Sequence, residues 1–136
     1  AGNVTKLANQ IMVACNIAAM GEALVLATKA GLDPEVVFQA VKGGLAGSTV
    51  LNAKAPMVIG RNFKPGFRIR LHQKDLRNAL LAAESLKVSL PFTSLAQQML
   101  ISLMNNGRGE LDHSGIVTFL EDMAQIEVRK PAAAAV

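Results

Sequence analysis

The 136-residue sequence predicts an all-α fold. Half of the residues are apolar, and Ala, Leu, Met and Val recur at spacings of three and four, which is the period of a helix. The β-branched alternation typical of strands is scarce, and Trp and Tyr are absent. Turns that contain Gly or Pro separate the apolar runs. The length suits one domain with a core. We therefore expect a multi-helix domain around a long buried first helix.

The first helix is expected over residues 2–30. Asn3 can act as its N-cap, because an Asn side chain accepts a backbone N–H that lacks an intrahelical partner. Apolar residues then occupy nearly every side of the helix, which predicts burial all round. Gly31 ends it in the manner of a C′ glycine. Polar residues within the run, Asn16 and Glu22 among them, favour a core helix over a membrane span.

Two shorter helices should follow. Asp33 is the expected N-cap of the second, with Pro34 in its first turn and a stop at the glycines 43–44. Its predicted buried face consists of Val36, Val37, Ala40 and Val41. Ser48 caps the third helix, which continues to about Ile59 and which Pro56 is expected to bend or shorten.

Three further helices complete the expected fold. A helix over 69–87 should bury Ile69, Leu76, Leu80, Ala83 and Leu86, and should leave Lys74, Asp75 and Asn78 off that face. The next begins at Pro91, ends near 105 and buries Leu95, Met99, Leu100 and Leu103. The last follows the segment 112–114 and carries Val117, Leu120, Met123 and Ala124. Residues 1–130 thus form the expected domain, and the alanine-rich segment 131–136 a disordered tail.

A polar cluster stands near the start of the first helix. Lys6, Asn9 and Gln10 are separated by three and four residues, which places their side chains on one side of a helix. A helix N-terminus carries positive partial charge and is an unfavourable place for a purely structural cation. Lys6 is therefore a candidate functional residue.

A second candidate region lies between residues 60 and 77. It contains the densest basic neighbourhood of the chain: Arg61, Lys64, Arg68, Arg70, Lys74 and Arg77. These residues form either a solvated surface or a site for an anion such as a phosphate or carboxylate. Phe63 and Phe67, in the loop 60–67, either anchor the loop or form the wall of a pocket. His113 has no further metal ligand at suitable spacing, so we interpret it as structural.

Several classes of protein receive no support. A formal charge of +4 without a basic stripe argues against nucleic-acid binding. The single cysteine, Cys15, permits no internal disulfide and is interpreted as a small core residue, which fits a reducing, cytoplasmic location. Signal-peptide features, a metal motif, a phosphate-binding loop and a strand–GxGxxG–helix unit are missing from the sequence. We expect neither nucleic-acid nor membrane partners.

Three segments resemble the C-terminal domain of the β-hydroxyacid dehydrogenase (3-hydroxyisobutyrate dehydrogenase-like) family. They are 2–10 (GNVTKLANQ), in which a glycine stands four residues before a lysine and amides follow; 43–48 (GGLAGS); and 63–76, which contains FKPGF and LHQKDL. The resemblance covers residues 2 to about 128. It implies a helical domain like the C-terminal domain of 6-phosphogluconate dehydrogenases.

The resemblance also implies a function. It suggests an NAD- or NADP-dependent oxidoreductase that interconverts a short 3-hydroxy acid and its aldehyde, with D-glycerate and tartronate semialdehyde as the expected pair. Lys6 corresponds to the catalytic lysine that donates or accepts a proton, and Lys74 to a cofactor-binding lysine. Asn9, Gln10, Phe67 and Asp75 correspond to substrate-side residues. Relatives often have Asn at the position of Gln10, so either amide is a candidate for substrate contact, and Arg70 replaces an expected acid.

The dinucleotide-binding domain of that family has no counterpart in residues 1–136. We therefore expect the chain to be part of a longer enzyme whose N-terminal domain binds most of the NAD or NADP, and we expect it to form homo-oligomers. The isolated chain should then be inactive. The alternative is a helical dimerisation or interaction module without catalysis of its own.

Overall fold

The computed structural model describes residues 2–132, and within them it contains six α-helices, one short 3₁₀-helix and no β-strand. The helices are α1 (Gly2–Lys29), α2 (Pro34–Val41), α3 (Thr49–Ile59), α4 (Ile69–Leu86), α5 (Pro91–Asn105), η1 (His113–Gly115) and α6 (Ile116–Ala124). The all-α prediction is confirmed. Residues 131–132 are not helical, and the rest of the predicted tail, 133–136, lies outside the described residues.

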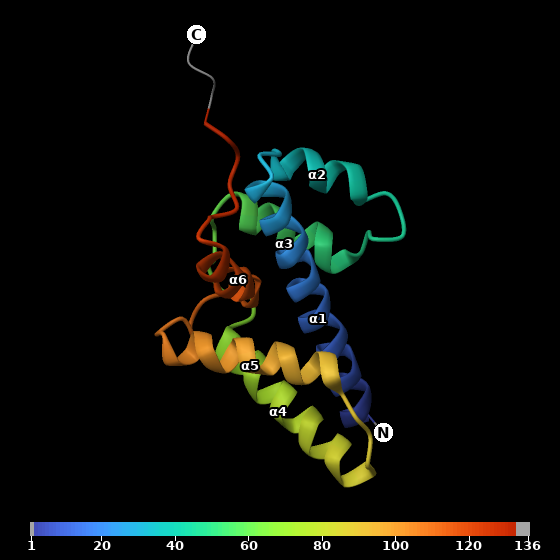
Figure 1. Cartoon of the computed structure of the whole chain (residues 1–136). Helices are drawn as coiled ribbons and strands as arrows, with labels where there is room; N and C mark the ends of the chain where they lie inside the picture. Colours follow the sequence, from blue (N-terminus) through green and yellow to red (C-terminus); the bar gives the residue numbers. More distant parts are fainter. Residues whose placement is uncertain (1, 133–136) are drawn as a thin grey trace.

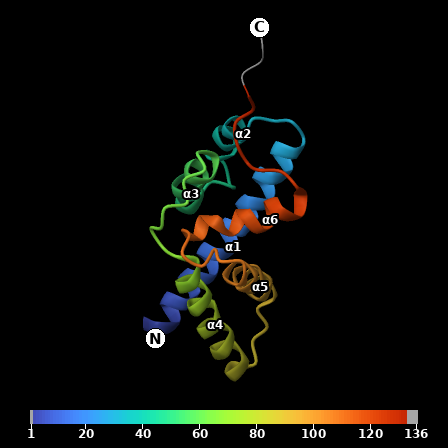
Figure 2. The same ribbon diagram turned by 90° about the vertical axis from the view of Figure 1, so that its left-hand side faces the viewer.

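Helix α1 is the centre of the arrangement, because it contacts each of the other helices and η1. Figures 1 and 2 show α4 and α5 beside its N-terminal half, and α2 and α3 beside its C-terminal half. Helix α6 crosses α1 at Gly21, where an added Cβ would lie 2.9 Å from Leu120 Cδ1. The missing side chain thus allows a close approach between the two helices.

The core lies where α1 meets these helices. Its fully buried members come from every α-helix except α2 and from the segment after α6: Ala14, Ile17, Ala55, Val58, Ile69, Leu76, Leu100, Leu103, Ile116, Val117 and Val128. Side chains from helices distant in the sequence therefore form one apolar cluster. Its burial is the main stabilising contribution to the domain.

The prediction that α1 is buried all round is wrong. Val4, Met12 and Leu26 are 58%, 65% and 72% exposed, so one side of the helix is open to solvent. An apolar sequence indicates what a helix side prefers to contact, but this chain supplies too few helices to cover every side of a 28-residue helix. By length and composition alone, Asn3–Lys29 could also cross a membrane. Its contacts with every other element are those of a core helix.

The predicted helix starts at residues 69 and 91 are confirmed. Of the three predicted side-chain caps, two are confirmed and one is wrong. Asp33 accepts a hydrogen bond from the Glu35 N–H at 2.9 Å, and Ser48 accepts one from the Leu51 N–H at 2.9 Å. Asn3 is not a cap, because α1 already begins at Gly2. Pro56 lies within α3 without shortening it.

Some predicted buried faces are rotated or interrupted. Helix α2 buries Pro34 and Phe38, whereas the predicted Val36, Ala40 and Val41 are exposed. This helix packs mainly against α1 and α3, so a narrow stripe suffices. Leu86, Leu95 and Met123 are exposed at the ends or outer sides of their helices. Asp75, predicted to lie off the buried face of α4, is only 8% exposed.

Candidate active site

The polar cluster predicted near the start of α1 meets the middle of α4. Lys6 Nζ lies 3.9 Å from Oδ1 of Asp75. The other carboxylate oxygen, Oδ2, accepts a hydrogen bond of 2.9 Å from Nε2 of Gln10. Because Lys6 and Gln10 are one helical turn apart, both reach the same carboxylate. The structure therefore brings together three of the predicted site residues from two helices.

Both ends of the Gln10 side-chain amide are hydrogen-bonded within the protein. Its NH₂ group donates to Asp75, and its Oε1 accepts a hydrogen bond of 2.9 Å from Nδ2 of Asn9. Gln10 is 8% exposed, whereas Asn9 is exposed. Of the two predicted amides, Asn9 is thus the one that faces solvent, and Gln10 links it to the buried carboxylate.

Lys6 combines a fixed counter-ion with an open side. Its side chain is 63% exposed, whereas that of Asp75 is 12% exposed. A buried carboxylate held by a hydrogen bond defines a position, and an exposed lysine tip remains accessible to a molecule that arrives from solvent. Chemically, this pair can bind an anion and can give or accept a proton.

Two buried histidines, His72 and His113, form a pair that contacts this cluster at the backbone of Gln10. His72 of α4 is fully buried, and its Nε2 lies 2.9 Å from the backbone oxygen of Gln10. Its Nδ1 lies 2.8 Å from Nδ1 of His113 in η1. Burial is the largest cause that lowers the pKa of His72, and it also lowers the pKa of His113 to about 4. Both rings are therefore neutral at pH 7.

Phe67 is held against the two histidines. Its ring centroid lies 5.6 Å from that of His72 and 5.3 Å from that of His113. Its carbonyl accepts a 2.7 Å hydrogen bond from the backbone N–H of His113. Phe63 packs against the core and under the Arg61 guanidinium. Both phenylalanines therefore anchor the loop. Phe67 contacts His72, which in turn contacts Gln10 of the Lys6 cluster.

Asp112 holds the loop 60–67 by accepting hydrogen bonds from its backbone N–H groups. Burial opposes its ionisation, but N–H groups of Phe67, Ser114 and Gly66 donate to the carboxylate and lower its pKa. Lys54 Nζ contributes an ion pair at 3.1 Å. The carboxylate, which is completely buried, thus ties α3, the loop and η1 together.

The predicted basic neighbourhood does not form one anion site. Arg61 pairs with Glu121 of α6, and Arg68 and Arg70 both pair with Glu110. Lys74, on α4 beside Asp75, is exposed and has no acidic partner among residues 2–132. Lys64 and Arg77 are likewise exposed and without one. The predicted cofactor residue Lys74 therefore keeps its charge available, whereas Arg61, Arg68 and Arg70 each have an acidic partner.

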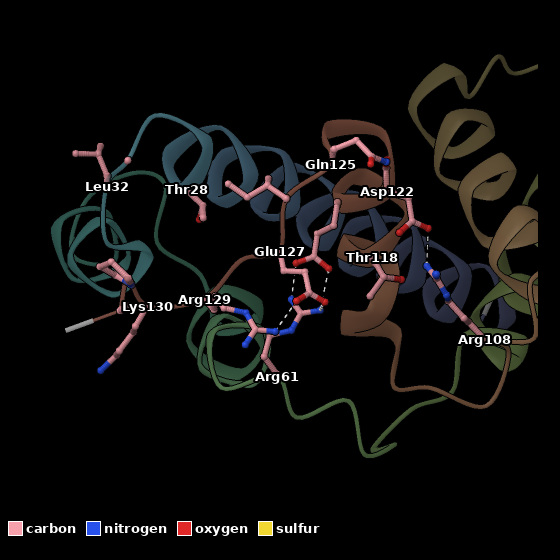
Figure 3. A pocket seen from close by; sticks show the side chains of 15 residues that line it. Thr28, Leu32, Arg61, Arg108, Thr118, Asp122, Gln125, Glu127, Arg129 and Lys130 are labelled. Carbon is pink, nitrogen blue, oxygen red and sulfur yellow. Dashed lines mark hydrogen bonds and ion pairs between the residues drawn. The ribbon is translucent and has the colours of Figure 1, made fainter. Parts of the chain in front are cut away.

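A charged hollow of about 710 Å³ lies at the opposite end of the domain (Figure 3). Arg61, Glu127 and Arg129 meet on one side of it, and Arg108 pairs with Asp122 on the other. Its arginines are paired with neighbouring carboxylates, and of the predicted candidate residues only Arg61, from the basic region 60–77, is among the described residues that line it. We interpret the ion pairs around this hollow as contacts that hold the C-terminal segment against α6.

Cys15 is not a candidate nucleophile. Burial raises the pKa of its thiol, and a hydrogen bond with Thr93 only partly offsets this. The thiol therefore stays protonated and weakly reactive at neutral pH. It lines an apolar groove of about 650 Å³ between α1 and the start of α5. The side chain is only partly buried, so its predicted place in the core is only partly right.

Sequence reasoning missed three residues that organise the site: His72, Lys54 and Asp112. His72 and His113 are 41 residues apart, and Lys54 and Asp112 are 58 apart. No periodic pattern links residues at such separations. Only the approach of α4, α3 and η1 in space reveals them.

Comparison with known proteins shows the family to which this chain belongs. A family model described as "NAD-binding of NADP-dependent 3-hydroxyisobutyrate dehydrogenase" matches residues 1–120. The 2-hydroxy-3-oxopropionate reductase of Escherichia coli K12 is 49% identical over 90% of this chain and 42% of its own length. The crystal structure of 3-hydroxyisobutyrate dehydrogenase from Salmonella typhimurium superposes with a TM-score of 0.81 at 28% identity, covering 85% of this chain and 40% of that one.

The fold and the matched model define a helical domain of the NAD(P)-dependent dehydrogenase type. The chain belongs to the 3-hydroxyisobutyrate dehydrogenase family. It spans about two fifths of the length of relatives such as the Escherichia coli reductase and the 2-(hydroxymethyl)glutarate dehydrogenase of Eubacterium barkeri, which is 33% identical over 94% of this chain. The family cofactor is a nicotinamide dinucleotide, NAD or NADP.

Proposed function

We propose that this chain is the C-terminal domain of an NAD(P)-dependent oxidoreductase that interconverts a short 3-hydroxy acid and its aldehyde. The observation that carries the proposal is the exposed Lys6 ammonium, 3.9 Å from the nearly buried carboxylate of Asp75. The 49% identity to a 2-hydroxy-3-oxopropionate reductase supports D-glycerate and tartronate semialdehyde as the substrate pair. We further propose a cytoplasmic homo-oligomer.

The chain offers donors that suit a nicotinamide dinucleotide, although it contains no phosphate-binding glycine turn at a strand–helix junction within residues 2–132. Lys74 presents an uncompensated ammonium on the exposed side of α4, next to Asp75. An ammonium of this kind can contact a hydroxyl, carboxamide or phosphate oxygen of the dinucleotide. Most of the binding would then come from a separate dinucleotide-binding domain.

In the proposed reaction the bound cofactor supplies or takes up the hydride. The residues of this chain bind the substrate and handle the proton. The Lys6 ammonium donates a proton to the carbonyl oxygen of the aldehyde as the alcohol forms, and the neutral amine takes it back in the reverse direction. Asn9 is placed to donate a hydrogen bond to the substrate, and Gln10 and Asp75 hold Lys6 and Asn9 in position. Phe67 is proposed to line the substrate site from the loop side.

The direct test compares two proteins in a nicotinamide absorbance assay with tartronate semialdehyde. The complete protein, with its dinucleotide-binding domain, should turn over the aldehyde with NADH or NADPH. The 136-residue chain alone should show none, because it lacks the phosphate-binding turn. Turnover by the chain alone, or none by the complete protein with any short semialdehyde, would contradict the proposal.

A second candidate function is an interaction module without catalysis. It is favoured by the apolar groove between α1 and α5, which is bordered by the exposed Met12, Phe92 and Leu95. A pure module predicts self-association that survives replacement of Lys6 and no turnover in the complete protein. Sedimentation of the Lys6→Ala protein, measured together with its activity, separates the two functions.

A further inference from the structure

The two histidines of this chain form a buried pair that links three elements. His72 lies on α4 and touches α1, and His113 lies in η1. Their Nδ1 atoms are 2.8 Å apart, which is a hydrogen-bond distance with one proton between the two nitrogens. The protons on this pair follow from the partners of each nitrogen.

The backbone oxygen of Gln10 can only accept, so the facing Nε2 of His72 carries the hydrogen. A neutral imidazole has one N–H, and Nδ1 of His72 is therefore the acceptor. It follows that Nδ1 of His113 carries the proton between the rings. The neutral pair thus has one defined arrangement: Nε2–H in His72 and Nδ1–H in His113.

This arrangement gives α4 a second hold on α1. His72 binds the backbone of Gln10, and Asp75, three residues further along α4, binds its side chain. In the neighbouring part of α1, Leu7 and Gln10 are the buried residues among positions 3–10. Lys6 lies one turn before Gln10 on the same helix, so these two contacts help to fix its position.

We propose that His72 is a positioning residue for the proton transfer: with His113 as its hydrogen-bond partner, it fixes α1 at Gln10 and so holds Lys6 and Asn9 against Asp75. This inference rests on the proposed function of that cluster. The pair also contacts Phe67, whose ring lies against both imidazoles and whose carbonyl accepts a hydrogen bond from the backbone N–H of His113. One buried pair thus aligns both candidate substrate-side segments.

The tautomers given above belong to the neutral pair. The charged groups that face it are Lys54 of α3, Asp75 of α4 and Asp112 before η1. Burial and the charge of Lys54 both lower the pKa of each ring, which keeps the pair neutral at neutral pH. A proton added at Nε2 of His113 would leave the hydrogen bond between the rings in place, whereas a proton added to His72 would require His113 to move its hydrogen from Nδ1 to Nε2. In both cases Nε2–H of His72 still donates to the backbone oxygen of Gln10.

The kinetic test uses three variants of the complete protein. His72→Gln retains an N–H donor near the position of Nε2, and His72→Phe keeps a ring without donors. Leu103→Ala is the matched control, because it removes a fully buried side chain of α5 outside the network. We expect His72→Phe to lower kcat per folded molecule by about 10- to 100-fold with little change in KM, since small misplacements cost that much. His72→Gln should regain most of it.

Two further measurements do not depend on any substrate. Nitrogen-15 spectra of the imidazoles, assigned with the single variants, should show Nε2–H for His72 and Nδ1–H for His113 at neutral pH. Amide hydrogen exchange across residues 3–11 should accelerate in His72→Phe but not in His72→Gln or Leu103→Ala.

The outcomes distinguish this inference from the proposed function. The opposite tautomers, or unchanged exchange in His72→Phe, would overturn the positioning role whether or not the protein is active. A kcat in His72→Phe equal to that of the Leu103→Ala control would also overturn it. The unmodified protein could instead show no turnover while the tautomers and the hydrogen exchange are as expected. That result would contradict the proposed function, but the contact of His72 with Gln10 would stand.

Discussion

The Lys6 ammonium lies 3.9 Å from the Asp75 carboxylate, and the two partners differ greatly in exposure, 63% for Lys6 and 12% for Asp75. Such a pair contributes little to stability, because solvent screens the exposed cation. Its value is positional. Asp75 is fixed by Gln10, and the lysine tip stays near a defined point while remaining open to a ligand.

Replacement of Lys6 in the complete protein tests its chemical role. Lys6→Ala should lower kcat by at least about a hundredfold, the lower end of what a positioned acid or base contributes. Lys6→Arg should fail as well, because a guanidinium stays charged and cannot exchange a proton. Steady-state kinetics with tartronate semialdehyde measure both. Partial rescue by arginine would indicate an anion clamp in place of acid–base chemistry, and near-normal kcat in both variants would remove Lys6 from the mechanism.

Asp75 should matter for stability through Gln10. Asp75→Ala leaves the buried amide donor of Gln10 without its acceptor, at a cost of about 1–3 kcal/mol in the free energy of unfolding. Asp75→Asn keeps an acceptor oxygen and should cost clearly less. Urea denaturation of the two variants measures the difference. Equal stability of both would mean that the hydrogen bond between Gln10 and Asp75 contributes nothing.

The ion pair between Arg61 and Glu121 should stabilise the C-terminal segment. The Glu121 side chain is 4% exposed and accepts hydrogen bonds from Arg61 and from the N–H of the buried Val128. Arg61→Ala leaves this carboxylate without its cation, and we expect a loss of about 3–5 kcal/mol in the free energy of unfolding. Arg129→Ala, which removes an exposed partner of Glu127, is the control and should cost less than about 1 kcal/mol. Similar losses in both variants would contradict the assignment.

The buried histidines and Asp112 should give two separate acid transitions in stability. The pKa of His113 is lowered from 6.5 to about 4, so the unfolded chain binds more protons between these values and stability falls as pH drops from 6.5 towards 4. The pKa of Asp112 is lowered from 3.8, so its contribution is lost at more acidic pH, below the unfolded value. Denaturant midpoints measured from pH 7 to pH 4 should show the first range, and the second should appear when the series is continued below pH 3.8.

His113→Asn assigns the first range, since asparagine can donate to His72 but does not titrate. Its stability should vary less than that of the unmodified chain between pH 6.5 and 4. An unchanged slope in this variant would show that another group causes the loss.

Much of the fold follows from local sequence. The helical period, the side-chain caps at Asp33 and Ser48 and the glycine at the end of α1 act over a few residues, so they can be recognised without knowledge of the neighbours. The set Lys6, Asn9 and Gln10 could be recognised for the same reason, since its spacing of one helical turn is a local property. The proposed role of Lys6 came from the family resemblance and stays a prediction.

Which helix sides face one another was decided only by the tertiary structure. The apolar pattern of α1 did not reveal that Met12 and Leu26 stay exposed, and the pattern of α4 did not reveal that Asp75 is buried. The contacts of His72 with His113 and of Lys54 with Asp112 join residues far apart in the chain. A buried polar group requires a partner, but sequence does not say which one, because packing of the helices selects it from all groups that come within about 3 Å.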